Sequence, residues 1–384
     1  MNTTLRDPGV RHAIVVSWHA QRAADLLSTA VLPEVRQLQR EHPATYAERH
    51  WVKGPHVAVI VPDAEPGQVD LDDSRRRLTQ AVAPLAGGPP LKEKEWLQQA
   101  ATLGKAELIE PPYGPLRPDR AVTVERYRPS SIELVGAEAY PLKERFLAAA
   151  VPAVGQTLAQ GDAMGSALRL LALHGSRWPL GGIEVGQLTY RSHLEDHLHL
   201  HGGDELRAAV QAAVARHLDG ARGLVAHLLQ TAPDGRYDGE DPLLRSWSDL
   251  LDQSWPQALE AAASGILGYE PGEAYAAKAE RLGEAEKRRW AYGENRTYSA
   301  FHEKQRSLSM LPEPVAATEF SAYRFLTNQA YRVLPLLDVT ASQRYLLCAL
   351  LTQAVEDVTG TTWMDLLSEA AEDASAMMGT GARA

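Results

Sequence analysis

The densest group of side chains able to move protons lies between residues 290 and 306, in the run WAYGENRTYSAFHEKQR. Tyr292, Tyr298, Ser299 and His302 can all donate a hydrogen bond at neutral pH. A run of this kind either lines a polar pocket or forms an aromatic-rich turn at the surface, and the sequence leaves both interpretations open. Ser299 lacks the context of a nucleophile elbow, so the run does not indicate a serine hydrolase.

A second group occupies residues 46–61, YAERHWVKGPHVAVIV. Alternation along a strand places Arg49, Trp51 and Lys53 on one side, ahead of a Gly-Pro turn and an apolar strand that begins at His56. The row could be the wall of a binding cleft. It could equally be the solvated edge of a structural hairpin.

Residues 187–201 contain four histidines, His193, His197, His199 and His201. His193 and His197 have helical spacing, whereas His199 and His201 alternate as in a strand, so we do not expect all four to converge. The order His-Leu-Glu-Asp-His is not the HExxH arrangement of zinc proteases. The chain has one cysteine, Cys348, and no phosphate-loop or dinucleotide motif. We therefore predict no metal and no cofactor.

A late segment predicts a helix with one polar face inside an apolar block. Arg324, Asn328 and Tyr331 recur at positions i, i+4 and i+7, and aromatic and aliphatic residues flank them. We expect this helix to be largely buried. A buried arginine needs either an internal acceptor or a bound ligand, and both remain open.

The elements that must position these groups predict an α+β protein, with an N-terminal mixed or antiparallel sheet and flanking helices, followed by a mainly helical C-terminal half. Strands are expected at 11–18, 44–51, 56–61 and 121–128. Helices are expected at 23–41, 71–87, 91–103, 142–159, 162–176, 203–229, 243–265, 272–290, 316–334 and 340–356, the last with Thr340 as N-cap. A glycine-rich break is expected at 178–186. We divide the chain into a sheet-rich region, 1–135, and a mainly helical region, 136–384, packed as one enzyme unit.

Composition limits the class of protein. Hydrophobic residues make up 45% of the 384 residues and charged residues 23%, the balance of a globular protein. The formal net charge of −10 disfavours a nucleic-acid partner. No apolar run is long enough for a membrane span, and the N-terminus lacks a signal-peptide pattern, so we expect a cytoplasmic protein that binds no membrane.

Three segments together resemble a known family. They are Arg49-His50-Trp51 with Gly54-Pro55-His56, then Tyr190-Arg191-Ser192-His193-Leu194-Glu195, then Gln343-Arg344-Tyr345-Leu346-Leu347-Cys348. In their order along the chain they resemble the small elimination module of lanthipeptide dehydratases and its stand-alone thiopeptide relatives. The likeness runs over most of the chain.

Two chemistries compete within that family. Elimination modules remove glutamate from glutamylated side chains and resemble one another in carrying arginines on the strand after Pro-His. Here those positions hold Ala58 and Ile60, which cannot pair with a carboxylate. This departure favours the sister enzymes, the pyridine synthases of thiopeptide antibiotic biosynthesis. A glutamate-eliminating module and a non-catalytic partner that binds the leader peptide are the alternatives.

The resemblance implies a cofactor-independent formal [4+2] cycloaddition between two dehydroalanines of a modified precursor peptide, with loss of water and leader, giving a pyridine-centred macrocycle. The expected partner is that precursor, a leader plus a core bearing dehydroalanine and thiazole, with other maturation enzymes as further candidates. From residue chemistry we assign proton donors and shuttles to Tyr292, Tyr298, Ser299 and His302. Substrate contacts are assigned to Trp290, Arg324, Asn328, Arg49 and His50, and leader contacts to the basic run Arg75, Arg76 and Arg77.

Overall fold

The computed structural model describes residues 11–62, 71–268, 273–290, 296–308 and 317–381, without the side chains of 273 and 373–381. The chain forms two compact units, each assembled from separate stretches of sequence. Unit 1 comprises residues 1–161, 270–296 and 332–338, and unit 2 comprises 162–269, 297–331 and 339–384. The sequence-based division after residue 135 stays a prediction, and the two units are described separately.

Unit 1 contains a four-stranded antiparallel sheet in the order β2-β3-β1-β4. The strands are β1 (Arg11–Ser17), β2 (Tyr46–His50), β3 (His56–Val61) and β4 (Val122–Tyr127). All four predicted strands are confirmed, as is the α+β class. The two central strands, β3 and β1, are rich in valine and isoleucine, and most of their residues are buried. Strand β4, in contrast, forms a largely exposed edge.

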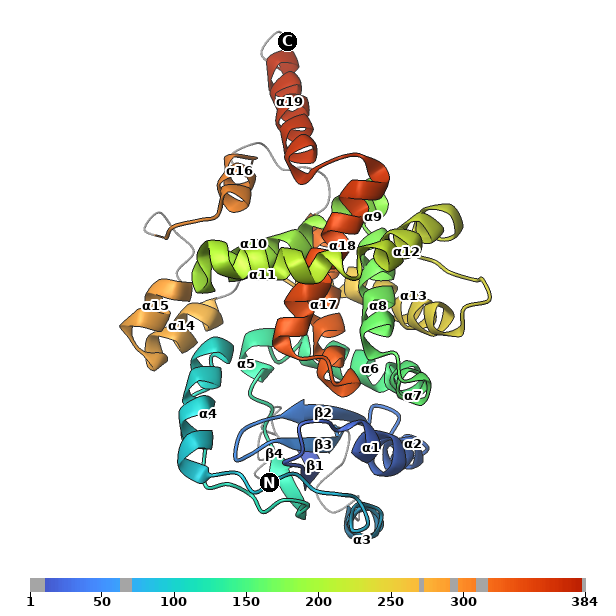
Figure 1. Ribbon diagram of the computed structural model, residues 1–384, viewed down its shortest axis with the longest axis vertical. Coiled ribbons are helices and arrows are strands. Elements are labelled where there is room, and N and C mark those ends of the chain that lie inside the picture. The colour runs from blue at the N-terminus through green and yellow to red at the C-terminus, as the bar shows by residue number, and fades with distance from the viewer. Residues whose placement is uncertain (1–10, 63–70, 269–272, 291–295, 309–316, 382–384) are drawn as a thin grey trace, which may run out of the picture. The chain divides into compact units, whose positions relative to one another are not determined.

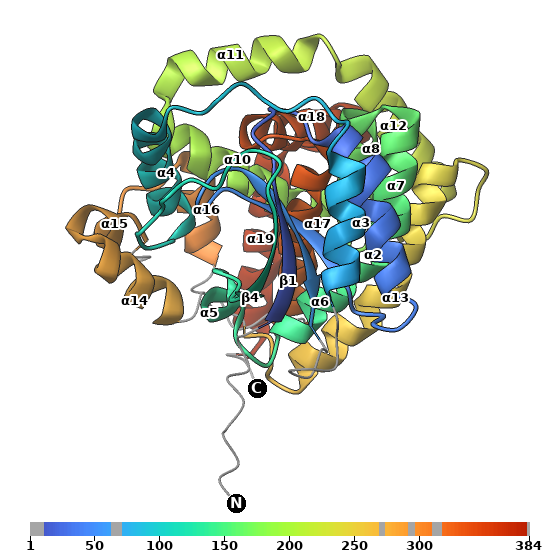
Figure 2. The same ribbon diagram turned by 90° about the horizontal axis from the view of Figure 1, so that it is seen from below.

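Helices pack on both faces of this sheet. The predicted helix at 23–41 comprises α1 (Ala24–Leu26), a π-helical turn (Leu27–Val31) and α2 (Leu32–Leu38). With α3 (Leu71–Val82) they lie beside the sheet in both views (Figures 1 and 2). The predicted helix at 142–159 is two helices, α6 (Tyr140–Ala149) and α7 (Val151–Gln160), with a proline in the first turn of α7. The other helices described in unit 1 are α4 (Glu93–Glu107), α5 (Ile132–Val135), α14 (Glu273–Leu282), α15 (Glu284–Trp290) and a 3-10 helix (Leu334–Leu337).

In the described part of unit 2, all regular secondary structure is helical. Its helices are α8 (Ala163–Ser176), α9 (Gly182–Gly186), α10 (Leu188–His201), α11 (Gly203–Ala215), α12 (Leu218–Thr231), α13 (Pro242–Ala263), α16 (Ala300–Leu308), α17 (Ala317–Val333, up to residue 331), α18 (Ala341–Thr359) and α19 (Trp363–Gly381). Helix α18 packs against α8, α10, α11 and α12 (Figure 1). Thr340 caps it in a capping box with Gln343, as predicted from the sequence. None of the helices in the described part of the chain has the length and apolar character that a membrane crossing requires.

One expectation for residues 178–201 is wrong, and a second holds only as far as residue 181. The strand-like alternation of His199 and His201 does not form a strand, because α10 continues to His201. The buried residues of α10 are Tyr190, Leu194, Glu195 and Leu198, a helical repeat that outweighs the local alternation. The predicted glycine-rich break ends in the short helix α9.

Candidate functional site

The candidate site in unit 2 is built on the imidazole of His302, which joins two serine hydroxyls. Its Nδ1 lies 2.8 Å from Ser299 Oγ, and its Nε2 lies 2.9 Å from Ser192 Oγ. Ser299 is buried, whereas the other two side chains are half-buried. Helix α10 supplies Ser192, and the start of α16 supplies the other two. An imidazole between two hydroxyls can pass a proton from one side of its ring to the other.

Part of this geometry also serves the helix itself. Ser299 directly precedes α16, and its hydroxyl accepts a bond from the His302 backbone N–H at 3.4 Å, as an N-cap does. Phe301 is buried against Trp363 of α19, with ring centroids 5.3 Å apart, which fixes the side of α16 that faces the protein. Helix capping explains why a serine stands at position 299. It does not explain why residue 302 is a histidine or why its imidazole contacts Ser192.

A second polar group adjoins the first. His193 follows Ser192 on α10, and its Nδ1 lies 2.9 Å from the hydroxyl of Tyr331. That hydroxyl also lies 3.3 Å from the sulfur of Cys348 on α18. Burial, with the nearby charge of Arg344 and then His302, lowers the pKa of His193 to about 3. Burial also raises the pKa of Tyr331 well above its usual value and that of Cys348 to about 11. All three groups are therefore uncharged at neutral pH.

Arg344 on α18 is the cation of this group. Its guanidinium lies 5.0 Å from the ring centre of Tyr331 and 4.8 Å from that of Tyr345, and Nη2 donates to the Tyr345 hydroxyl at 2.9 Å. Its Nε is buried without a hydrogen-bond partner. Tyr345, Tyr331 and Cys348 act most strongly on its pKa, and its charge in turn acts on His193; no carboxylate is among these groups. A guanidinium held by tyrosines keeps its charge available to an oxygen of a ligand.

Together these side chains offer a cation, uncharged donors and a hydroxyl–imidazole relay in one helical cluster. Such a set can polarise a carbonyl and move a proton to or from a neighbouring atom. Nearby ion pairs hold the cluster in place: Arg191 pairs with Glu356 at 2.7 Å and joins α10 to α18, and Arg207 pairs with Glu195 at 2.8 Å and joins α11 to α10. In the described part of the chain, no three acidic, histidine or cysteine side chains converge as metal ligands would.

The site residues predicted within 290–306 do not all lie in this cluster. Ser299 and His302 meet as described, and Tyr298 is beside them in sequence but is engaged by Arg306, whose Nη1 donates to its hydroxyl at 2.9 Å. Tyr292 lies outside the described residues. Trp290 ends α15 in unit 1, where its ring lies 5.5 Å from that of Tyr275.

Arg324 and Asn328 both lie on α17. The guanidinium of Arg324 is half-buried and donates to the carbonyl oxygen of Gly268 at 2.8 Å, so it has an internal acceptor. Asn328 is exposed and Tyr331 is buried, so the predicted polar face runs from the surface into the candidate site.

The predicted hairpin residues are held by their own unit. Arg49 forms an ion pair with Asp338 and donates to the carbonyl oxygen of Pro335 at 3.0 Å. His50 lies 3.1 Å from Ser130 Oγ and 5.6 Å from the ring of His56. Burial lowers the pKa of His50 to about 4 and that of His56 to about 3. These contacts agree with a structural hairpin, and a role in substrate binding stays a prediction.

The basic run on α3 is matched by acidic residues. Arg75 pairs with Asp72 at 3.2 Å, Arg76 pairs with Asp73, and Arg77 pairs with the buried carboxylate of Glu34 at 2.6 Å. A leader that binds this run through its own carboxylates would have to compete with these acidic residues. Leader binding at Arg75–Arg77 stays a prediction, with weaker electrostatic support than the sequence implied.

Sequence reasoning did not assign Ser192, Tyr331 or Arg344 to the site, and it weighed His193 only as a metal ligand. Ser192 and His193 lie in the second segment that carried the family resemblance, and Arg344 lies in the third. The signal was therefore present, but residues from α10, α16, α17 and α18 converge only through tertiary packing.

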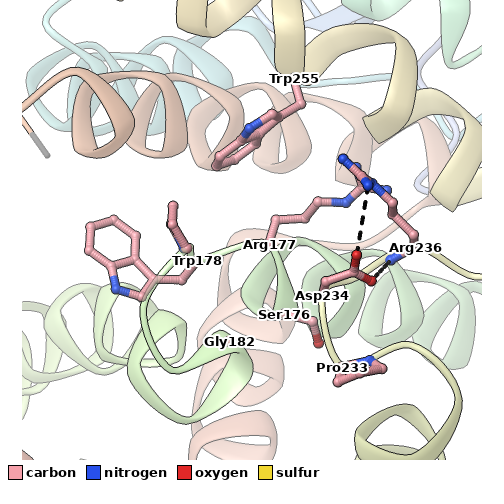
Figure 3. Close-up of a pocket in the computed structure, with 9 residues that line it drawn as sticks. Ser176, Arg177, Trp178, Gly182, Pro233, Asp234, Arg236 and Trp255 are labelled. Carbon is pink, nitrogen blue, oxygen red and sulfur yellow. Dashed lines mark hydrogen bonds and ion pairs between the residues drawn. The ribbon is translucent and has the colours of Figure 1, made fainter.

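Unit 2 also contains a pocket of about 400 Å³ outside this cluster (Figure 3). It is lined by Ser176, Arg177, Trp178, Pro179, Gly182, Pro233, Asp234, Arg236 and Trp255. The two indoles come from different elements, Trp178 from the loop after α8 and Trp255 from α13. Its size falls within the range of small-molecule sites.

Comparison with known proteins finds relatives by structure. The chain is similar to the pyridine synthase TbtD from thiomuracin biosynthesis, with a TM-score of 0.69 and 21% identity over 91% of this chain and 99% of that one. It is also similar to TsrL, with a TM-score of 0.60 and 16% identity over 93% of this chain and 98% of that one. No family model matches the sequence, and no curated protein matches it. At these identities the likeness establishes a shared fold.

Proposed function

We propose that this chain is a pyridine synthase of thiopeptide biosynthesis. The observation that carries the proposal is the match to TbtD, which spans nearly all of both chains rather than one shared module. The sequence resemblance supports the same family, and the cluster around His302 and Arg344 supplies the polar groups that the reaction needs. In the proposed reaction two dehydroalanines of one precursor peptide join in a six-membered ring.

The reaction needs no change of oxidation state in the protein. One dehydroalanine and the amide before it tautomerise: the amide proton moves from nitrogen to oxygen, which leaves a 2-azadiene. Two new carbon–carbon bonds join this diene to the alkene of the second dehydroalanine. The former amide oxygen then leaves as water, and the leader leaves as its C-terminal amide, which gives the aromatic pyridine.

Arg344 is proposed to polarise the amide oxygen during the tautomerisation. Its charge is not neutralised by a described carboxylate, and the tyrosines on either side fix its position. Charge that develops on the oxygen is stabilised more strongly than the neutral amide, which is the condition for lowering a barrier. His193 and Tyr331 are uncharged, so they can exchange protons with the substrate without adding a competing ion.

His302 is proposed to serve the later loss of water. Its two nitrogens reach Ser299 and Ser192, so a proton can move through the imidazole to a hydroxyl that faces the ring intermediate. Tyr298 is a further donor beside this relay. Tyr292 keeps its predicted role as a proton donor, and Trp290 keeps its predicted role in contacting the substrate; the described contacts support neither role.

Positioning is proposed to supply most of the acceleration. Two residues distant in the peptide must be held at reacting distance, and well-oriented intramolecular reactions gain about 7–11 kcal/mol from this effect. A helical unit with side chains fixed by ring contacts and ion pairs suits that task. We also propose that the precursor contacts Arg324, Asn328 and the Arg49–His50 hairpin.

A glutamate-eliminating activity is the second candidate, favoured by one observation. A guanidinium without a carboxylate partner, such as Arg344, could hold the carboxylate of a departing glutamate. Ala58 and Ile60 are buried apolar residues of β3 and offer no such contact.

The test presents the purified protein with two precursors, one bearing two dehydroalanines and one bearing glutamylated serines, and records product masses. A pyridine synthase converts the first precursor to a macrocycle and leaves the second unchanged. Release of glutamate from the second precursor would instead establish elimination. Binding of both precursors without any mass change would indicate a leader-binding partner and refute the proposed activity.

A further inference from the structure

The pocket in Figure 3 has two aromatic walls that are fixed in place. Both indoles contact the ring of buried Tyr323 edge-on, Trp178 at 5.2 Å and 80°, and Trp255 at 6.3 Å and 74°. Tyr323 is itself anchored, because its hydroxyl donates to the carbonyl oxygen of Gly186 at 2.8 Å. Walls held in this way lose little conformational freedom when a ligand enters, which favours binding of a flat ring.

The charges around the pocket cancel. Buried Arg177 donates to Asp252 at 2.8 Å and to the carbonyl oxygen of Gly235 at 2.9 Å. Arg236 at the rim pairs with Asp234, as the dashed lines in Figure 3 indicate, and lies 3.7 Å from Asp252. Two arginines thus face two aspartates. An anionic ligand such as a phosphate would find no surplus positive charge, whereas an uncharged ring with hydrogen-bond acceptors is compatible with the site.

The backbone at the pocket is shaped around a glycine. Gly182 has φ of +51°, and a Cβ at this position would lie 2.8 Å from the carbonyl oxygen of Pro233, which also lines the pocket. A side chain would therefore need both a strained backbone and a displaced loop. The close approach of these two segments fixes one wall of the pocket.

Helix α17 connects this pocket with the candidate active site. Tyr323 contacts the indoles, and Tyr331 contacts His193 with ring centroids 5.2 Å apart. The two tyrosines are eight residues apart, which is about 12 Å along a helix axis. Exposed Asn328 lies between them in sequence, where its amide can bond a peptide backbone.

We propose that this pocket binds a planar, uncharged heteroaromatic ring of the precursor peptide while a dehydroalanine reacts near His193 and His302. The ring contacts at each end add to the 12 Å along α17, so an extended peptide needs about four to seven residues to join the two places. The ring therefore belongs to a residue at that separation from the reacting dehydroalanine. This inference rests on the proposed function.

The kinetic test uses two precursors that differ at one residue, about five positions from the reacting dehydroalanine: a thiazole in one and alanine in the other. The variants are Trp178→Leu and Trp255→Leu, with Trp96→Phe on α4 of unit 1 as the matched tryptophan control. Loss of either indole should raise KM for the thiazole precursor about tenfold, with kcat within about twofold, since one aromatic contact and its buried area are worth about that factor. KM for the alanine precursor should be high already and should not respond.

Equal increases in KM for both precursors would overturn the inference and indicate that the pocket holds the leader or another segment. Unchanged KM values would also overturn it. If the wild type converts neither precursor, the proposed function fails, and a binding measurement decides the pocket alone. A leaderless thiazole peptide should then quench tryptophan fluorescence of the wild type and of Trp96→Phe, but not of Trp178→Leu/Trp255→Leu. Absence of saturable quenching in the wild type would refute the pocket proposal.

Discussion

Replacing Arg344 by methionine separates its contribution to stability from its contribution to catalysis. Methionine keeps much of the length of the side chain and removes the charge. The fold loses the hydrogen bond to the Tyr345 hydroxyl and two cation–π contacts, at 5.0 and 4.8 Å. Burying the guanidinium offsets part of these contacts, so we expect the free energy of unfolding to fall by only about 1–3 kcal/mol.

The effect on rate should be larger. If Arg344 donates to the oxygen of the imidic tautomer, its removal should lower kcat by about 10²–10³-fold, which corresponds to about 2.7–4 kcal/mol. KM should change little, because the interaction strengthens only as charge develops. Arg344→Lys keeps the charge but loses the planar guanidinium group, so its kcat should lie between that of the wild type and that of Arg344→Met. Methylguanidinium in the buffer should restore part of the activity of Arg344→Met.

The assay follows the released leader by chromatography under steady-state conditions, with urea denaturation of each variant alongside. Arg222→Met is the matched control, since Arg222 on α12 is a more exposed arginine of the same unit, and its partners are Asp357 and, at 3.1 Å, Asp219. It should keep the wild-type kcat. A folded Arg344→Met protein with wild-type kcat would refute the proposed role. If the activity of Arg344→Met falls only in step with its stability, and methylguanidinium does not restore it, the role of Arg344 is structural.

Four further predictions use the same assays. Ser299→Ala should lower kcat by up to about 10²–10³-fold and lower the free energy of unfolding by about 1 kcal/mol. Ser299→Asn should preserve the N-cap of α16 and therefore the stability, but its kcat should still fall. Wild-type kcat in both variants would exclude the relay. Burial lowers the pKa of His174 on α8, like that of His193, to about 3, so below pH 6.5 the unfolded chain binds protons that the fold excludes. The free energy of unfolding should therefore fall by up to about 1.4 kcal/mol per pH unit for each histidine. A flat urea midpoint from pH 7.5 to 5 would contradict this, and His174→Gln should reduce the slope. Lys143→Met should lower the free energy of unfolding by about 3–5 kcal/mol, because the buried carboxylate of Glu48, 3.0 Å from Lys143, loses its nearest cation. The double variant Lys143→Met/Glu48→Gln should regain much of this loss. An unchanged urea midpoint for Lys143→Met would contradict the prediction. Metal analysis of the purified protein should find no stoichiometric transition metal, and chelator should leave activity intact; one equivalent of zinc lost together with activity would overturn that prediction.

The sheet could be predicted from sequence because its signals are local. Strands β1 and β3 are short runs of β-branched residues, and the Gly-Pro turn before His56 separates β2 from β3. The helices around Pro152 and Gly283 were predicted as single elements because apolar periodicity continues across each break. Boundaries of this kind depend on backbone geometry that periodicity does not encode.

The candidate site could be predicted only in part. Ser299 and His302 are three residues apart at a helix start, so their proximity is local and the sequence indicated it. Ser192 and Arg344 reach the same cluster from α10 and α18, and nothing in their spacing indicates the packing that brings them there. Arg49 shows the opposite case: its residue type suggested binding, but Asp338, far away in sequence, satisfies its charge.

The identity of the C-terminus on the released leader tests the central claim most directly. The wild-type protein is incubated with a precursor that carries two dehydroalanines, and both products are analysed by mass spectrometry. The proposed cycloaddition predicts a leader that ends in a carboxamide, together with a macrocycle lighter by the leader amide and one water. A leader that ends in a carboxylate would indicate hydrolysis, and an intact precursor would indicate no reaction; either result would contradict the account.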